Sequence, residues 1–508
     1  MPITDLNYDI LYTIYTVIPS SSILHFMRTS RLFYIHGVPH LLKHVLPTVV
    51  FKSEASFRSF CNFMLQSESE DKDVDDRFQY LEVLRIGLFR WETFTEQMFV
   101  KVISRAKHLH ILSFASVDAF RSTDTPGEPS QFFIDAFKEP TSITELILHS
   151  TSDDFGSKLL EVIIAPKLKI LQTEHPVADL PDALLIGKKF SSTLEELYLG
   201  WMLAGLTETS TTVTEIPIYP RVHTLEIFGS LHIDTVSLIP AFPNLSVCKI
   251  QFDFDREDYD LVLHLYEQNK RRQIQRNLKN ASGGGDRPWT HFDSLWGDVY
   301  SVAAFAPQFR IPHLNVTPII DQRTSVLYPI FEDTRPVQLT INMECMQFAR
   351  NHIWSATGMP PTLDVESMKQ LQRLTLEVRN MGGLGVSTIF EGVTRFLKHQ
   401  HVTHLALRLM GIRSSHLKET HEYVLEEFYF ATLGRTIAAN MPSLTFFCVE
   451  MPDPKRFDAW QVSRPTSGTI RGLQDSTQII FLEKIPRAIA VAIVRENDLL
   501  ELEDLRVA

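Results

Sequence analysis

The residues of this chain that could do chemistry lie in a few short segments, and none of these segments is complete. Residues 380–385 (Asn-Met-Gly-Gly-Leu-Gly) have the glycines of a phosphate cradle but no following Lys-Ser/Thr, so a tight turn is the simpler interpretation. His108 and His110, like His399 and His401, would place two imidazoles on one side of an extended segment, yet no nearby cysteine or carboxylate completes a metal shell. The chain contains neither Gly-x-Ser-x-Gly nor His-Glu-x-x-His. We therefore expect no enzyme activity, no cofactor and no metal site.

A recurring apolar phrase, Leu-x-x-Leu-x-Leu or a close variant, dominates the sequence instead. Its copies begin at residues 81, 109, 143, 168, 194, 222, 245, 311, 371, 402 and 444. The first seven copies follow one another at steps of 23 to 34 residues, and most steps match the repeat of about 20–29 residues in leucine-rich repeats. Within a copy the last two apolar residues are two apart, which is the period of a strand with one buried face.

Apolar residues with helical spacing lie between some of these copies, at 94–103, 132–137 and 389–397. Strands that alternate with helices predict a right-handed parallel arrangement. A doubly wound α/β sheet would show the same alternation, but roughly ten units without a nucleotide fingerprint favour a solenoid. The predicted fold class is α/β, a leucine-rich-repeat-like solenoid with parallel strands inside and helices outside.

In such a solenoid the residues that alternate with the buried apolar positions line a concave sheet. They carry mixed charge and aromatic rings, which suits a protein interface, although an ordinary solvated sheet face would look similar. The candidate substrate-binding residues on this face are Arg85, Tyr198, Phe228, Arg373, Arg408 and Phe446.

Composition narrows the class of partner. The chain has 508 residues, 44% of them hydrophobic and 22% charged, so it can bury a large core. Its net charge of -12 argues against nucleic acid as a partner, and no apolar run reaches the length of about 18 residues that spans a membrane. The start, Met-Pro-Ile-Thr-Asp, shows no secretory signal, and four cysteines without a Cys-x-x-Cys pair suggest reduced thiols. We expect a cytoplasmic or nuclear protein that binds other proteins and neither nucleic acid nor membranes.

The first 46 residues contain no copy of the phrase and form three amphipathic segments. Leu6 to Ile18 has helical spacing and ends at Pro19, a second short segment runs from Ile23 to Met27, and Ser30-Arg31 begins a third that continues to Val45. About 40 residues are too few to hold a stable core alone. These segments must therefore pack on the end of the repeat array, on a partner, or on both.

The same residues carry a family resemblance. Leu6-Asn7-Tyr8-Asp9-Ile10-Leu11-x-x-Ile14, followed by Ile23-Leu24 and by Met27-Arg28-Thr29-Ser30-Arg31-Leu32-Phe33, resembles an F-box motif. The whole chain is loosely similar to fungal F-box proteins with divergent leucine-rich-like repeats. The usual proline of the motif is Asn7 here, which can also occupy the first turn of a helix.

The resemblance implies a substrate-recognition subunit of a cullin-type ubiquitin ligase. Its box would dock a Skp-type adaptor and its repeats would bind a protein substrate. The alternative is a ligase-independent scaffold whose box-like helices only cap the solenoid. Carried over by position, the candidate adaptor-binding residues are Leu6, Asp9, Ile10, Ile14, Leu24 and Met27.

The predicted organisation has three parts. Residues 1–46 form the box-like three-helix unit, 47–77 a connector with an acidic loop, and 78–508 the solenoid. We expect a flexible insertion near 269–288, where a basic run that could end a helix precedes a glycine-rich stretch. A nuclear localisation signal is an alternative interpretation of that basic run.

Overall fold

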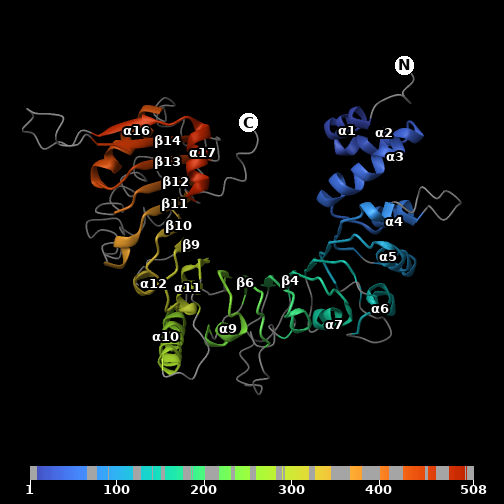
Figure 1. Ribbon diagram of the computed structural model, residues 1–508, viewed down its shortest axis with the longest axis horizontal. Coiled ribbons are helices and arrows are strands. Elements are labelled where there is room, and N and C mark those ends of the chain that lie inside the picture. The colour runs from blue at the N-terminus through green and yellow to red at the C-terminus, as the bar shows by residue number, and fades with distance from the viewer. Residues whose placement is uncertain are drawn as a thin grey trace, which may run out of the picture. The chain divides into compact units, whose positions relative to one another are not determined.

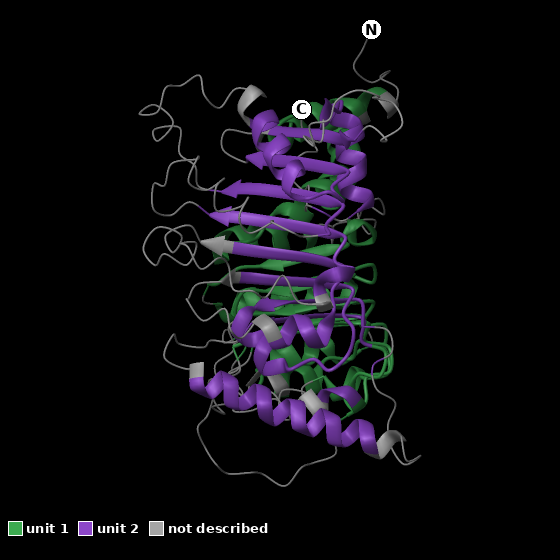
Figure 2. Ribbon diagram, turned by 90° about the vertical axis from the view of Figure 1, so that its left-hand side faces the viewer, with its two compact units in different colours: residues 1–232, 240–244 green, residues 233–239, 245–508 purple. Residues whose placement is uncertain are grey.

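The computed structural model divides into two compact units, unit 1 (residues 1–232 and 240–244) and unit 2 (residues 233–239 and 245–508), shown in Figures 1 and 2. The chain passes between the two units at residues 232/233, 239/240 and 244/245, and the second of these points lies in helix α9 (Thr235–Ala241). The structure describes residues 8–65, 77–89, 91–117, 120, 128–139, 141–149, 155–174, 185, 187–200, 217–229, 235–251, 259–281, 289, 292–319, 327–344, 366–379, 401–410, 427–451, 456–464, 480–497 and 499.

Unit 1 begins with short helices, as the apolar spacing predicts. Ser30 caps the third of them, where its hydroxyl accepts a hydrogen bond from the Phe33 amide at 3.1 Å. Pro19 separates the first from the second. The helical elements are α1 (Tyr8–Val17), α2 (Ser20–Met27), α3 (Arg31–His40), the π-helical turn η2 (Leu41–Val45), the 3-10 turn η3 (Leu46–Thr48) and α4 (Glu54–Leu65).

The sheet of unit 1 is parallel throughout its described strands. They are β1 (Val83–Ile86), β2 (Ile111–Phe114), β3 (Glu145–Leu148), β4 (Ile170–Glu174), β5 (Glu196–Gly200) and β6 (Thr224–Phe228). Pairing is in register, so the second apolar residue of each phrase lies beside the same residue of the next. This fully buried row is Leu84, Leu112, Leu146, Leu171, Leu197 and Leu225.

Helices cover the leucine face of this sheet, here called the helix-covered face. Phe99 on α5 (Thr93–Arg105) meets Phe114 of β2 with ring centroids 6.1 Å apart, and Phe133 on α6 (Gln131–Phe137) also contacts Phe114. These two helices confirm the predictions for 94–103 and 132–137. Each buried phenylalanine contributes about 1.5–3 kcal/mol of hydrophobic free energy. The other covering elements are α7 (Phe155–Val162) and the 3-10 turn η7 (Lys188–Phe190).

Unit 2 continues with parallel strands and ends with antiparallel ones. Its second apolar positions again form one row, which includes Cys248, Leu314, Leu374 and Phe447. The strands are β7 (Val247–Gln251), β8 (Ser294–Asp298), β9 (His313–Ile319), β10 (Gln338–Glu344), β11 (Arg373–Arg379), β12 (His404–Met410), β13 (Phe446–Met451), β14 (Arg456–Ser463) and β15 (Phe481–Lys484), with β13–β14 and β14–β15 antiparallel.

The helices of unit 2 lie mostly on the leucine side of its strands. Gly297 of β8 faces Val302 of α11, and Gly434 of α16 faces Phe447 of β13. The helical elements are α10 (Tyr259–Ala281), α11 (Val299–Phe305), α12 (Leu327–Thr334), the 3-10 turn η10 (Glu366–Gln370), α16 (Glu427–Asn440) and α17 (Arg487–Glu496). The predicted α/β class with mostly parallel strands is confirmed.

Two of the predicted segments contain helix. The connector 47–77 contains α4, whose Phe57, Cys61 and Met64 are fully buried, because its apolar face packs on the following helix. The insertion near 269–288 is helical as far as Ala281, and Asn269 and Gln273 are buried. The remaining residues of these segments, 66–76 and 282–288, lie outside the described part of the chain.

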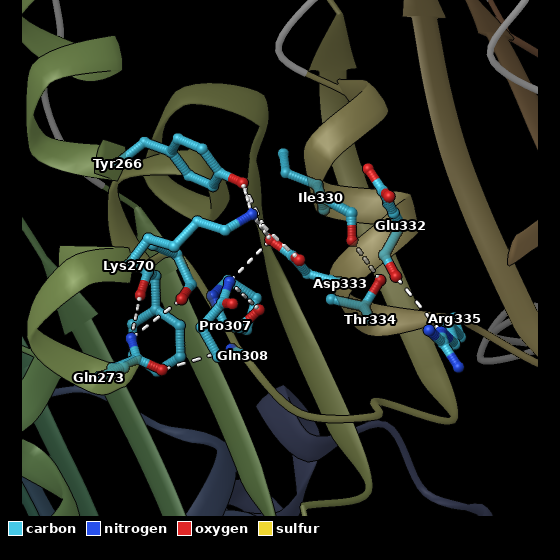
Figure 3. A network of polar contacts seen from close by, with 12 residues as sticks. Tyr266, Lys270, Gln273, Pro307, Gln308, Ile330, Glu332, Asp333, Thr334 and Arg335 are labelled. Atoms are coloured by element: carbon cyan, nitrogen blue, oxygen red, sulfur yellow. Dashed lines mark hydrogen bonds and ion pairs between the residues drawn. The ribbon is translucent and has the colours of Figure 1, made fainter. Parts of the chain in front are cut away.

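Polar contacts attach α10 to its neighbours in unit 2, and Figure 3 shows them. Lys270 donates to the Tyr266 hydroxyl at 2.7 Å and to the Asp333 carboxylate at 3.0 Å. Gln308 donates to the same carboxylate at 2.7 Å. Burial and the neighbouring Asp333 both raise the pKa of Tyr266, so the phenol stays protonated and can donate.

A second contact of α10 closes the end of α11. Ala306 takes a left-handed conformation there, with φ 47°. The buried Gln273 side chain donates to the carbonyl oxygens of Ala306 at 2.9 Å and Phe305 at 3.3 Å. Asn269 donates to the Ala304 carbonyl at 2.6 Å. Side chains of α10 therefore satisfy carbonyls that the last turn of α11 leaves without partners.

We expect Gln273→Ala to lower the free energy of unfolding by about 1–3 kcal/mol, because it leaves these buried carbonyls without their donor. Gln275→Ala is the matched control, since Gln275 is exposed on the same helix and should change stability little. Urea unfolding of both variants measures the difference. Equal effects of the two substitutions would show that the contact does not stabilise α11.

Candidate protein-binding surfaces

The interior of the box-like helices is built around Tyr15. Its ring lies 5.5 Å from those of Phe26 and His40, and its hydroxyl donates to the Phe33 carbonyl. Burial raises the pKa of Tyr15 to about 12. Phe26 stacks on Phe33 with centroids 4.1 Å apart. These contacts join the first, second and third helices into one small unit.

Gly37 lets these helices approach closely. A Cβ atom there would lie 2.5 Å from Met27 Cγ and 2.8 Å from the Tyr15 hydroxyl oxygen. Met27 is only 3% exposed for this reason. Its expected place on the adaptor-facing surface is therefore a wrong prediction for this conformation, since the side chain fills the interior.

Other apolar side chains of the same helices point to solvent. Ile10 and Leu24 are each 49% exposed, and Ile14 is half-buried. Val17 and Ile35 are also exposed, at 73% and 47%. We call Ile10, Val17, Leu24 and Ile35 the N-terminal apolar patch. Of the remaining predicted adaptor-binding residues, Leu6 and the side chain of Asp9 lie outside the described part of the chain.

The segment after these helices closes the first edge of the unit 1 sheet. Phe51 forms a parallel bridge with Ile86, its amide donates to the Arg85 carbonyl at 3.1 Å, and the Gly87 amide donates to the Phe51 carbonyl at 2.7 Å. An edge strand left open would expose unpaired backbone groups. The N-terminal part of unit 1 thus also acts as a cap.

The sheet face opposite the helices, here called the inner face, carries partly exposed side chains in unit 1. Register places aliphatic residues and carboxylates side by side in one row and mixed polar groups in the next. Arg85 and Tyr198 lie in the second row. Phe228 lies two residues after Glu226 on β6, in the next row of the same face. The first row is Ile111, Glu145, Ile170, Glu196 and Thr224, and the second is Arg85, Ser113, Ile147, Gln172, Tyr198 and Glu226.

Carboxylates dominate the electrostatics of this face. Burial raises the pKa of Glu145, Arg85 opposes the shift and Glu196 adds to it. Tyr198 donates to Glu196, and burial together with this hydrogen bond raises the pKa of the phenol. The face therefore combines negative charge with half-buried aliphatic and aromatic surface.

A row of ion-paired side chains lies across neighbouring strands on the inner face of unit 2. Arg408 Nη1 lies 3.1 Å from Glu377 Oε1 and Arg408 Nε lies 2.8 Å from Glu450 Oε2. Asn342 extends the row by donating to Glu377 at 3.1 Å. Although burial disfavours the guanidinium, Glu450 and Glu377 hold the pKa of Arg408 above its usual value. Arg408 is thus engaged within the protein.

Helix α17 covers another part of the same inner face. Its Ala490 and Val494 are buried in one cluster with Phe446 and Cys448 of β13, and Figure 1 shows α17 crossing strands β14 to β12. Phe446 is 3% exposed as a result. The prediction that Phe446 lies open to a substrate is wrong here, because the sequence pattern does not reveal the covering helix. Arg373 remains partly exposed. Burial of His404, which pairs with Arg373 in the sheet, lowers the pKa of its imidazole, and the positive charge of Arg373 lowers it further.

The described residues contain no candidate metal site. No group of three histidine, cysteine or carboxylate side chains there could hold a metal ion. A surface cleft of about 400 Å³ at the ends of α5 and α6 has ionisable walls of lysines and carboxylates. They are Lys107, Lys138, Lys167, Asp135 and Glu139. Among the helices that the structure describes, none is both long enough and apolar enough to cross a bilayer.

In comparison with known proteins, no protein-family model matches the chain, and no curated protein matches it either.

We expect Gly37→Ala to destabilise the N-terminal helices by about 1–3 kcal/mol, because the added methyl group overlaps Met27 and the hydrogen-bonded Tyr15 hydroxyl. Helix propensity alone would predict a gain of about 1 kcal/mol. Hydrogen exchange of amides in α1–α3 measures the effect. Gly37→Ala combined with Met27→Ala should recover part of the loss, and an unchanged exchange rate in Gly37→Ala would contradict the close packing.

We expect Glu145→Gln to raise the free energy of unfolding at pH 7. The pKa of Glu145 is higher in the folded than in the unfolded chain. The contribution of Glu145 to the free energy of unfolding is therefore greatest at pH values below its unfolded pKa, and it declines as pH rises through its folded pKa. The gain from the substitution should therefore shrink as pH falls towards 4. Urea unfolding at both pH values measures it, with exposed Glu139→Gln as the control. A gain that grows at low pH would have the wrong sign.

Proposed function

We propose that this protein is a substrate-recognition subunit of a cullin-type ubiquitin ligase. Its N-terminal helices would be an F-box that docks a Skp-type adaptor, and its strand-helix units would be leucine-rich-like repeats that bind a protein substrate. The proposal rests most on the N-terminal apolar patch, because four large apolar side chains of one small helical unit are about half or more exposed. A cytoplasmic or nuclear location is part of the proposal.

The position of the patch within the sequence pattern supports the proposal. Ile10 and Leu24 lie at the positions that the resemblance assigns to adaptor contact, and both are exposed. Their helices are rigidly joined beneath the surface by Tyr15 and Gly37. A rigid support reduces the entropy that docking would lose.

The inner face of unit 1 supports the substrate-binding part of the proposal. Its rows mix half-buried aliphatic, aromatic and charged side chains, which is the composition of protein interfaces. Glu145 is held there although burial disfavours its charge. Residues kept at some cost in stability are typical of binding surfaces.

A scaffold without a ligase role is the second candidate, and one observation favours it. The bridge between Phe51 and Ile86 makes the N-terminal part a cap for the sheet, which a solenoid needs in any case. Capping uses the segment after η3, whereas the N-terminal apolar patch lies on α1, α2 and α3. The two roles use different residues and can be separated by mutation.

We expect the double variant Ile10→Asp/Leu24→Asp to lose capture of a purified Skp-type adaptor by at least about tenfold, because docking would then bury two unpaired carboxylates. Both side chains are exposed, so the fold should tolerate the change. A pull-down with recombinant adaptor measures it.

Ile218→Asp is the matched control, since Ile218 is 59% exposed elsewhere in unit 1. It should capture the adaptor as the unmodified protein does. If the unmodified chain captures no adaptor, or if the folded double variant captures it equally well, the scaffold is the better account.

A further inference from the structure

The inner face of unit 1 is open in the part of the chain that the structure describes. Helices α5, α6 and α7 lie on the opposite side of its strands, as Figure 1 shows. The side chains of the first two rows of the inner face are all partly exposed, and none of the described elements of unit 1 lies over them. Aliphatic, aromatic and charged side chains without a covering element form a surface that a docked partner can bury.

The first row of this face alternates aliphatic and acidic side chains. Ile111 of β2 pairs with Glu145 of β3, Glu145 with Ile170 of β4, and Ile170 with Glu196 of β5. Neighbouring strands lie about 4.8 Å apart. The backbone positions of Glu145 and Glu196 are therefore about 10 Å apart, with Ile170 midway between them.

Carboxylates give these two rows an excess of negative charge. Glu145, Glu196 and Glu226 lie in them, against one arginine, Arg85. Burial raises the pKa of Glu145, and Arg85 offsets this effect only in part. Among the residues that the structure describes, none forms an ion pair or a hydrogen bond with the Glu145 side chain. A cation from a partner would supply the charge-assisted contact that this carboxylate lacks.

Tyr198 shows where this negative charge is concentrated. Burial has the largest effect in raising the pKa of its phenol, and the hydrogen bond to Glu196 and the charges of Glu196, Glu226 and Glu145 raise it further. Carboxylates from β3, β5 and β6 therefore act together on one part of the face. The aromatic ring of Tyr198 lies there too and can contact a cation through its π-electrons.

An α-helix laid across the strands matches the spacing of the first row. Helix residues three or four positions apart rise by about 4.5–6 Å, close to one strand spacing, and residues seven positions apart rise by about 10.5 Å, close to two. The chain contains a helix in this orientation, since α17 crosses strands on the inner face of unit 2. There the facing side chains are small, namely Ala406, Cys448 and Ala459. On unit 1 the larger Ile170 and Tyr198 would keep a helix farther from the strands, within reach of long basic side chains.

We propose that the inner face of unit 1 binds an amphipathic helix of a partner protein. This helix carries basic residues seven positions apart, over Glu145 and Glu196, and an aliphatic residue between them, over Ile170. The inference deepens the proposed function and rests on it, because the helix would belong to the substrate that the repeats bind. It defines the substrate segment by its conformation, its charge and the spacing of its basic residues.

Two helical peptides of the same composition test the spacing. The first is an alanine-based peptide of about 15 residues with two lysines seven positions apart and a leucine between them, stapled because so short a helix is marginal in water. The second has its lysines five positions apart, which places them about 140° apart around the helix. Fluorescence anisotropy of each labelled peptide with the full-length protein measures Kd. We expect the first peptide to bind at least about tenfold more tightly, because both of its lysines reach carboxylates.

We expect Glu145→Gln/Glu196→Gln to weaken binding of the first peptide by at least about tenfold, because two charge-assisted contacts become neutral. Both side chains are partly exposed and glutamine has nearly the same shape, so the fold should tolerate the change. Glu139→Gln/Glu161→Gln is the matched control, since it removes the same charge from exposed positions outside the inner face. It should bind the peptide as the unmodified protein does.

Several results would overturn the proposal. The unmodified protein could bind neither peptide, or it could bind both equally, in which case the spacing of the lysines has no effect. The Glu145→Gln/Glu196→Gln protein could bind as tightly as the unmodified one, or the control variant could lose as much affinity. The peptide assay uses no adaptor and the adaptor pull-down uses no peptide, so failure of this inference and failure of the proposed function are distinguishable.

Discussion

In-register pairing of parallel strands is the constraint on which the rest of each unit depends. Because Leu84 pairs with Leu112 and Leu112 with Leu146, every second side chain is committed to the helix-covered face and every other one to the inner face. A slip of one residue would exchange the two sets. The buried leucines therefore hold the sheet together and also decide that Glu145 and Tyr198 face the other way.

A sheet of parallel strands ends in edge strands, and the backbone N–H and C=O groups on the outer side of an edge strand have no neighbouring strand to pair with. In unit 1 the Phe51 bridge occupies the edge of β1. In unit 2 the chain reverses, and antiparallel β14 and β15 follow the parallel β13. A parallel partner needs a long crossover, whereas an antiparallel one needs only a hairpin connection, so reversal is a short way to finish a sheet.

Much of this fold could be predicted from sequence because the leucine phrase marks strands that are buried on one side. The leucine phrase does not predict strands β8 and β10, because it is interrupted in both. In β8, Gly297 replaces the last apolar residue of the phrase, at a place where a Cβ would lie 2.5 Å from the Ile250 carbonyl oxygen. In β10, Pro336 occupies the first position of the phrase. The candidate sites were harder. Exposure of Ile10 follows from local helical spacing, but burial of Met27 depends on Gly37 of another helix. Burial of Phe446 depends on α17, some 40 residues further along the chain.

The two inner faces differ in how their polar side chains are satisfied. In unit 2, Arg408 is held between Glu377 and Glu450, so both carboxylates of that row already have a cationic partner within the protein. In unit 1, Glu145 lies between isoleucines, and Arg85 only partly offsets the effects of burial and of Glu196 on its pKa. A surface that satisfies its own charges gains little from a charged partner, whereas one that leaves a desolvated carboxylate gains a charge-assisted contact. Under the proposed function, a cationic substrate segment would therefore suit the inner face of unit 1.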